Sequence, residues 1–496
     1  MQSFVNKLID KKLYWILLAI FYAMIFIPYI YSVFYSMPAN DDFAWALEWW
    51  TGNRAVESIY RVGWNYMNFY GQSGFFAILV QVLFNPLYWF DNQGNSFGIC
   101  MVIVFALVTV GTIIAIRRLI ADLSKIESKP VIDVATFLVT ALLFTSYYYF
   151  DVYNWWSGTP GYSLMLMMML FTLDYIVRYM DNPKKSTYIW MIVLGIIVCS
   201  GMMFCVTVGL FYVVYVFWVK RKENISAIKR IVPIALFVIS GLVTVIAPGN
   251  HQRMANGGLE DVSMRASLIV TTVRVFLRTR ATIISKPALD IALILLFLIG
   301  IKYKGKVKRS LLTLILFFVS IYIAACGAVL PYVYGLQKQL DTEFNARIFF
   351  VEDYITYIGL ALWMLLFGQY IGWCIKTNIK TSVVAGISCL VIVIGLLYGN
   401  YHGYLGRLIP IDIVRHADLI VEKNVFWNDI LDEVKNSEPG SDVVINRVDI
   451  PWCDYSYITS LDDIYRDPPV EGYMYGTCNQ CASLYYGVRS IVLNLE

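Results

Sequence analysis

Long apolar runs recur along this chain and leave few folds open to it. Runs such as 13–35, 98–116, 131–149 and 350–372 alternate with short polar loops. A membrane-spanning helix needs about 20 apolar residues, and in lipid its backbone must be hydrogen-bonded within the helix. The chain is 59% hydrophobic and only 15% charged, whereas soluble domains are about 25% charged. We therefore expect an all-α polytopic membrane protein.

Basic residues predict how the chain is oriented in the membrane. Lys7, Lys11 and Lys12 precede the first apolar run, and short basic segments stay in the cytoplasm. No small-residue cleavage site follows that run, so we interpret it as a retained signal anchor. The net charge of the whole chain is only +4, which does not indicate a nucleic-acid partner. We expect a cytoplasmic N-terminus and an extracytoplasmic C-terminus.

Whether segment 73–90 crosses the membrane decides on which side every later loop lies. It is apolar but is interrupted by Asn85-Pro86, and the next clean run ends in Arg117-Arg118. If 73–90 crossed the membrane fully, this basic loop would lie outside, against the usual distribution of charge. We therefore predict that 73–90 makes no net crossing. The first outer loop then covers residues 36–96.

The remaining runs complete a membrane module over residues 1–400. They predict about eleven crossings, within a range of ten to thirteen. Segment 188–219 predicts a hairpin of short helices that turns at Ser200-Gly201 and barely reaches the outer face. The basic-amphipathic residues 259–285 predict an interfacial helix. Residues 401–496 are charged and contain turn residues and short β-like runs, so we expect a small extracytoplasmic α/β domain.

Three of the nine cysteines lie in this polar tail, and six lie in or beside apolar runs as ordinary core residues. Cys478-Asn-Gln-Cys481 has zinc-like spacing, but no second Cys/His pair lies nearby, so we do not expect a metal there. Whether Cys478 and Cys481 form a disulfide stays open.

Two adjacent carboxylates, Asp41 and Asp42, stand where the chain leaves the first apolar run. Such a pair can act as a general base, as a metal ligand, or as both. It can also begin a helix, because acidic side chains are favoured at the N-cap and in the first turn. The structural and the catalytic interpretations are compatible.

Other polar residues follow directly on the ends of the apolar runs, so they should meet the acidic pair near the outer boundary. They are Arg61, Asp151, Asn154, Asn250, His251, Arg253, Lys338 and Arg347. A carboxylate beside Arg stays ionised, as a base must be. Arg and Lys suit a phosphate, and Arg can bind it through two hydrogen bonds. Each residue alone could be a turn residue or an interfacial anchor, but their shared side favours one site.

The order of these features resembles the GT-C superfamily of integral-membrane glycosyltransferases. Asp41-Asp42 and the aromatic-acidic loop Tyr147–Gly158 carry the resemblance, together with the C-terminal outer domain. Ala247-Pro-Gly-Asn-His-Gln-Arg253 looks like the Pro-Gly-Asn-x-x-Arg element of a bacterial branch. That branch is similar to polytopic glucosyltransferases that decorate surface polysaccharides. The Trp-Trp-Asp motif of oligosaccharyltransferases is missing, which counts against transfer to protein Asn.

The resemblance implies an enzyme of the bacterial plasma membrane that works among membrane lipids. A sugar would move, with inversion, from a polyprenyl-phosphate donor to a surface-glycan acceptor on the extracytoplasmic side. Asp41 or Asp42 would take the proton from the acceptor hydroxyl. The residues expected to bind the donor phosphate are Asn250, His251, Arg253, Lys338 and Arg347. Those expected around the acceptor or in the second acidic loop are Arg61, Asp151 and Asn154. A divalent cation, Mg or Mn, stays open, with Asp42 and Asp151 as its candidate ligands.

Two other classes of protein compete with this interpretation. A transporter or flippase of lipid-linked glycans would place ionisable residues and broken helices near the bilayer midplane. Most apolar runs here carry no charge inside, and Asp174 stands late in its run, near the inner end. A non-catalytic membrane scaffold would not need an acidic pair opposite His and Arg. The transferase interpretation is therefore favoured.

Overall fold

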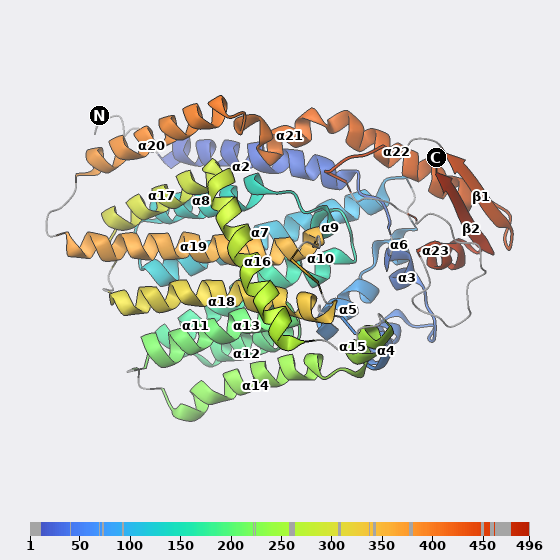
Figure 1. The fold of residues 1–496 in the computed structure, drawn as a ribbon, viewed down its shortest axis with the longest axis horizontal. Coiled ribbons are helices and arrows are strands. Elements are labelled where there is room, and N and C mark those ends of the chain that lie inside the picture. The colour runs from blue at the N-terminus through green and yellow to red at the C-terminus, as the bar shows by residue number, and fades with distance from the viewer. Residues whose placement is uncertain are drawn as a thin grey trace.

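Long helices lie side by side over most of the chain, and a small sheet lies at one end of them (Figure 1). The computed structural model describes residues 11–39, 41–68, 70–71, 74–91, 94–221, 223, 225–256, 263–305, 309–336, 338–340, 344–375, 380–447, 451–456, 461 and 478–495. The N-terminal helix begins at one end of the bundle, and the C-terminal sheet lies beyond the opposite end.

Nine helices of the described chain are long and apolar enough to cross a membrane, or ten if one bent pair is counted. The nine are α2 (Lys11–Phe34), α7 (Ser96–Ser124), α8 (Lys129–Ser146), α11 (Ser163–Asp181), α13 (Met202–Tyr212) with the π-helix η1 (Val213–Val219), α14 (Ala227–Val245), α18 (Leu311–Gly335), α19 (Ala346–Cys374) and α20 (Thr381–Tyr401). The bent pair is α16 (Met264–Ser285) and α17 (Pro287–Lys302), which meet at 87°. The prediction of an all-α polytopic membrane protein is confirmed. The apolar α12 (Lys185–Cys199) has only 15 residues, which is why fewer spans are counted than the predicted eleven.

The first loop after α2 leaves the bundle and returns to it at the same place. It contains α3 (Asp41–Ala46), α4 (Arg54–Asn68), α5 (Gly74–Leu83) and α6 (Pro86–Phe90). Asn95 Nδ2, just before α7, donates to Phe34 O at 2.9 Å. A Cβ on Gly98 would lie 1.9 Å from the same oxygen, so α7 begins directly against the end of α2. The ten residues of α5 reach only about 15 Å. These contacts support the prediction that 73–90 makes no net crossing.

The elements α9 (Phe150–Tyr153), α10 (Gly158–Gly161) and α15 (Pro248–Asn256) pack against this first loop, α10 on α5 and α15 on α4. We call this end of the bundle the loop end. The hairpin of α12 and α13 turns at Ser200, as predicted, and Ser200 O lies 2.2 Å from where Gly74 would carry a Cβ. Gly74 has a φ of +76°, which suits a glycine in so tight a contact. The hairpin therefore reaches further into the loop end than predicted.

The basic-amphipathic α16 packs across the bundle, as Figure 1 shows in front of α18 and α19. Its Ser267, Thr271 and Val275 are buried, and Tyr322 of α18 donates to its backbone at 2.6 Å. The helix was predicted to be interfacial. In the structure one of its faces is covered by other helices, while the opposite face carries exposed apolar side chains.

The opposite end of the bundle collects the basic loops, and we call it the basic end. Arg118 pairs with Asp174 at 2.6 Å, Arg178 with Asp122 at 2.7 Å, and Lys220 with Asp181 at 2.7 Å. These ion pairs join α7, α11 and the end of η1. The cations are therefore neutralised locally where the helices end.

The C-terminal residues form the small α/β domain that the sequence predicted. Its elements are η2 (Leu405–Arg407), α21 (Ile409–Arg415), α22 (Ala417–Lys435), β1 (Asp442–Arg447), α23 (Cys478–Tyr486) and β2 (Ser490–Leu495). The two strands are parallel, with Asp442 opposite Ser490. The domain rests on the loop end, where Tyr485 OH donates to Leu87 O at 3.1 Å. Cys481 is a buried free thiol, and the side chain of Cys478 lies outside the described residues.

Candidate active site

Asp42 lies in the first turn of α3 and is completely buried. Its Oδ1 accepts hydrogen bonds from the backbone N–H and the hydroxyl of Ser157 at 2.9 and 2.5 Å. Its Oδ2 accepts from Ala39 N at 3.1 Å. The prediction that the carboxylates of the first loop face the cations therefore does not describe Asp42, which joins two backbone segments instead. Burial raises the pKa of this carboxyl to about 7, although the hydrogen bonds from Ser157 and Ala39 act to lower it.

Asp41 is exposed, in contrast to its neighbour. Its charge acts on the thiol of Cys481, whose pKa is raised to about 12 mainly by burial and further by Asp41. Asp41 thus lies where α23 of the C-terminal domain packs on α3, beside the edge-on contact of Phe43 with Tyr485. Of the two adjacent carboxylates, Asp41 is the one that a substrate can reach.

Aromatic residues of the second outer loop fasten that loop to the first. Trp155 Nε1 donates to Ala39 O at 3.1 Å, and Trp156 Nε1 donates to Gln81 O at 3.0 Å. Both indoles are buried. The sequence left these aromatics open as a simple interfacial belt, whereas here they position the turn that holds Ser157 against Asp42.

Asn154 and Arg61 are buried positioning residues in the structure. Asn154 Nδ2 donates to Ser32 O at 3.1 Å, and its Oδ1 accepts from Tyr148 OH at 2.5 Å. Arg61 pairs with Glu57 at 2.9 Å, with both side chains fully buried, and donates to Ala44 O at 2.6 Å. Arg61 therefore links α4 to α3, and Asn154 links the second outer loop to α2.

The hydrogen bonds of Glu57 allow the polar connection between α3 and α4 to be buried. Its two oxygens accept from the backbone N–H groups of Trp49, Trp50 and Thr51 at 3.1 to 3.3 Å, besides the Arg61 guanidinium. Hydrogen bonding and the Arg61 charge lower the pKa of Glu57 even though burial opposes them. The ionised pair fixes the connection between α3 and α4, and hence the place of the Asp-Asp turn.

The acidic residue that does meet a cation is Asp151. Arg347 Nη1, at the start of α19, lies 3.7 Å from Asp151 Oδ2, and the guanidinium carbon lies 5.3 Å from the centre of the Trp155 ring. Burial raises the pKa of Asp151, because it outweighs the lowering by the Arg347 charge and by the Arg347 backbone N–H. The expectation that Arg keeps its neighbouring carboxylate readily ionised is therefore weakened at this position.

The Pro-Gly-Asn-x-x-Arg segment folds as α15. Asn250 Nδ2 donates back to Thr244 O at 2.7 Å, which caps the junction with α14. His251 and Arg253 are exposed. Arg253 Nη1 lies 3.9 Å from where a Cβ on Gly71 would stand, so it reaches across to the first outer loop.

The sequence pattern did not single out Tyr162, whose hydroxyl lies within the electrostatic influence of two of the predicted cations. The charges of Arg347, Asp151 and Arg253 all act on its hydroxyl, as does the ring hydroxyl of Tyr332. Lys338 lies over that same Tyr332 ring, with Nζ 5.7 Å from its centre. Arg347 pairs with Asp151, and the charge of Arg253 acts on the same tyrosine; that these residues form one site stays a prediction. The only sequence signal for Tyr162 is its place at the entry of an apolar run.

The candidate metal ligands do not assemble into a metal site. Within the described ranges, no three His, Cys, Asp or Glu side chains lie close enough together to hold a metal ion. Asp42 is engaged by Ser157 and Ala39, and Asp151 by Arg347. This donor set does not fit a divalent cation held by protein ligands alone.

The chain matches no known protein family, no curated protein and no solved structure. The resemblance of its motifs to GT-C enzymes therefore stays a prediction. The candidate site residues include the exposed carboxylate of Asp41, the guanidinium groups of Arg253 and Arg347 from separate elements, and the Tyr162 hydroxyl on which both of these charges act. Such a set can accept a proton and bind an anion.

Proposed function

We propose that this protein is a membrane glycosyltransferase that moves a sugar from a polyprenyl-phosphate donor to a surface-glycan acceptor. One observation supports the proposal: the charges of Arg253 and Arg347, which lie far apart in the sequence, both act on the Tyr162 hydroxyl, and Arg347 also pairs with Asp151. Two guanidinium groups in the same region suit a phosphate that gains charge as its bond to the sugar breaks. Asp41 stands exposed at the same end of the bundle.

In the proposed reaction, Asp41 takes the proton from an acceptor hydroxyl. The acceptor oxygen then attacks the anomeric carbon, the bond from that carbon to the phosphate oxygen breaks, and the configuration inverts. Polyprenyl phosphate leaves with the bonding electrons, and Arg253 and Arg347 stabilise its new charge. Asp42 holds the Asp-Asp turn against Ser157. His251, Asn250 and Lys338 surround the phosphate region.

The location of this chemistry follows from the basic end. Because basic loops stay in the cytoplasm, the loop end faces the extracytoplasmic side of a bacterial plasma membrane in this proposal. The N-terminus is then cytoplasmic, and the C-terminal domain, which rests on the loop end, is outside. A lipid-linked donor would reach the site from the outer leaflet.

The test of this proposal is turnover by the purified protein. The protein in lipid nanodiscs is incubated with a panel of polyprenyl-phosphate sugars, and release of polyprenyl phosphate is measured together with incorporation of sugar into a glycan. Asp41→Asn should reduce turnover about 10²- to 10⁴-fold, and thermal unfolding of the variant checks that it remains folded. Near-normal turnover in both Asp41→Asn and Asp42→Asn would place the base elsewhere.

The cations are tested on the same donor. Arg253→Gln should lower turnover more than it weakens donor binding, because the guanidinium acts most on the charge of the transition state. Arg253→Lys should recover only part of the activity, since Lys lacks the planar fork. Arg265→Gln, at an exposed Arg in the first turn of α16, is the matched control and should keep full activity. Unchanged turnover in Arg253→Gln would leave that residue as an anchor.

A second candidate function, transport of a lipid-linked glycan, is favoured by two features inside the bundle. Glu352 of α19 is buried, and among the described residues neither of its oxygens has a hydrogen-bond partner. The 87° bend between α16 and α17 interrupts a helix pair beside it. Intramembrane carboxylates and broken helices are typical of transport pathways.

The two functions are separated by what Glu352→Gln changes. In a transporter this variant should abolish movement of a fluorescent lipid-linked oligosaccharide across proteoliposomes. In a transferase it should leave release of polyprenyl phosphate intact, since Glu352 lies on α19 beyond Arg347 and away from Asp41. Movement of the lipid without any release of polyprenyl phosphate would favour the transporter.

A further inference from the structure

A crevice runs through the bundle between α11, α13, η1, α18 and α19. It consists of two adjoining hollows that share Phe211, Val214 and Phe317. The hollow near the middle of the bundle holds about 570 Å³ of space and the one nearer the basic end about 420 Å³, both counted together with their openings to the surroundings. Their walls are almost entirely apolar. The crevice is separate from the loop end, so it does not belong to the proposed transferase site.

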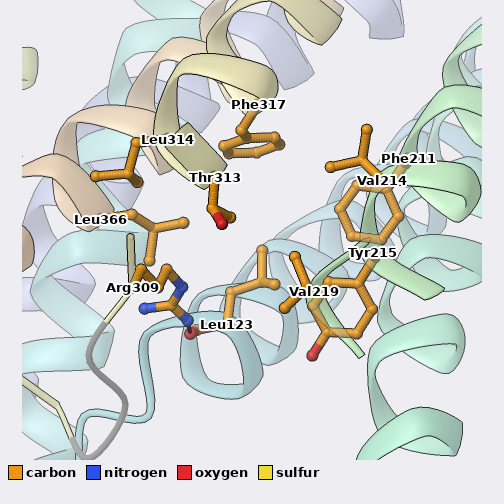
Figure 2. A pocket seen from close by; sticks show the side chains of 10 residues that line it. All are labelled: Leu123, Phe211, Val214, Tyr215, Val219, Arg309, Thr313, Leu314, Phe317 and Leu366. Atoms are coloured by element: carbon orange, nitrogen blue, oxygen red, sulfur yellow. Dashed lines mark hydrogen bonds between the residues drawn. The ribbon is translucent and has the colours of Figure 1, made fainter. Parts of the chain in front are cut away.

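Among the described residues that line this crevice, Arg309 is the one cation, and it stands at the basic end. Figure 2 shows Arg309 on one wall with Leu314 and Leu366, and Tyr215 on the facing wall. Arg309 Nη1 donates to Gln369 Oε1 at 3.3 Å, and Nη2 donates to Leu123 O. Both acceptors are neutral.

The absence of an acidic partner sets Arg309 apart from its neighbours. In the part of the chain that the structure describes, no carboxylate lies within ion-pair distance of Arg309. Arg118, Arg178 and Lys220 at the same end are each paired with an aspartate. Burial lowers the pKa of Arg309, and the fields of Tyr215 and Asp181 only partly offset this effect. A half-buried guanidinium whose hydrogen-bond partners among the described residues are neutral is suited to receive an anion.

One wall of the crevice is a π-helix. Val214, Tyr215 and Val219 all belong to η1, where the backbone widens from the α-helical pattern. π-Helices are rare and are frequent at functional sites. Trp218, also in η1, donates to Thr313 Oγ1 of α18 at 3.2 Å. This contact joins η1 to α18 at Thr313, which also lines the crevice.

We infer that this crevice binds an anionic phospholipid, with its phosphate at Arg309 and one acyl chain between α13 and α18. The apolar walls match a hydrocarbon chain, and the unpaired charge matches a phosphodiester. The position of Arg309 at the basic end of the bundle also fits, because basic pockets between helices at the cytoplasmic boundary bind anionic lipid head groups. The inference does not depend on the transferase proposal.

A purely structural role for Arg309 must be distinguished from this one. Arg309 also caps the C-terminal end of α7 through Leu123 O, so its removal can lower stability in either case. Only lipid binding makes Arg309 determine a preference between head groups. The experiment therefore measures selectivity, not stability alone.

The full-length protein is delipidated in detergent and titrated with phosphatidylglycerol or phosphatidylcholine carrying the same acyl chains, and bound lipid is counted by native mass spectrometry. Phosphatidylglycerol should bind about tenfold more tightly, because both lipids carry a phosphodiester but the choline cation of phosphatidylcholine offsets its negative charge. Arg309→Gln should abolish this preference, and Arg309→Lys should retain part of it. Arg221→Gln, which removes an exposed Arg from the same end, should keep the preference in full.

A second variant keeps the test decisive if Arg309→Gln does not fold. Val214→Trp fills the space shared by the two hollows and should weaken both lipids without altering the preference between them. Equal binding of the two lipids by the wild-type protein would overturn the inference. Displacement of phosphatidylglycerol by millimolar inorganic phosphate would also overturn it, because the site would then serve a soluble anion.

Discussion

Ionisation of Asp42 should make the folded protein less stable as the pH rises through the neutral range. Its pKa is about 7 in the fold, against an ordinary value of 3.8. Between these two values the folded protein keeps a proton that the unfolded chain has already lost. The stabilisation that protonated Asp42 contributes is therefore fully present below about pH 4, falls as the pH rises, and is lost by about pH 7. The difference between the two pKa values corresponds to about 4 kcal/mol in the free energy of unfolding.

The Asp42→Asn variant removes this titration. The amide still accepts from Ser157, but its NH₂ group meets the Ala39 N–H, so one hydrogen bond is lost at a cost of about 1 kcal/mol. At pH 8 the variant should therefore exceed the wild type by about 3 kcal/mol, which is the difference between the two effects. This difference in unfolding free energy between the variant and the wild type should shrink as the pH falls and disappear between about pH 4 and 5.

The measurement is thermal unfolding by intrinsic Trp fluorescence, in nanodiscs at constant ionic strength, from pH 4.5 to 8.5. Asp41→Asn is the comparison variant: it should keep the fall in stability with rising pH but make it somewhat smaller, because the charge of Asp41 adds to the rise in the pKa of Asp42. Parallel curves for the wild type and Asp42→Asn over the whole range would refute the reasoning. They would mean that Asp42 is already ionised in the fold and that its three hydrogen bonds outweigh its burial.

Three further changes test the packing of the loop end and of α19. Arg61→Met should lower the free energy of unfolding by about 3–5 kcal/mol, since it leaves Glu57 as an unpaired buried charge, and adding Glu57→Gln should recover part of the loss in the same denaturation assay. Glu352→Gln should keep or raise the melting temperature because no hydrogen bond among the described residues is lost, and a clear fall would reveal a partner. Gly158→Ala should lower the melting temperature, since its Cβ would lie 1.8 Å from a backbone oxygen of α9, whereas Gly63→Ala, with nothing within 4 Å, should not.

Much of the bundle could be predicted from the sequence because hydropathy and basic loops report directly on the bilayer. Apolar length predicted the spans. The Arg117-Arg118 loop, through the parity of crossings, predicted that 73–90 turns back. Where the pattern was weaker the prediction was poorer. The α12–α13 hairpin reaches the loop end because Gly74 has no Cβ and lets Ser200 O approach closely. Such a contact leaves no periodic pattern of apolar residues in the sequence.

The candidate site was harder to predict because the direction of a polar side chain is a tertiary property. Asp41 and Asp42 are adjacent and chemically alike, yet one is exposed and the other is buried. The difference is made by Ser157, which is 115 residues away. Arg61 similarly resembles a surface cation in sequence, and only the fold shows that Glu57 and the backbone of α3 enclose it.

Because Asn95 contacts Phe34, the two ends of residues 36–95 meet, and this segment could be exchanged as a unit. The segment leaves and re-enters the bundle at one point, so lengthening or replacing it would not reverse the direction of any later helix. The entropy of closing such a loop also grows only slowly with its length. During synthesis, α2 and α7 can enter the membrane as one hairpin, with the carboxylate pair in the segment between them. Sequence changes within this segment would therefore leave membrane insertion of the remaining chain untouched.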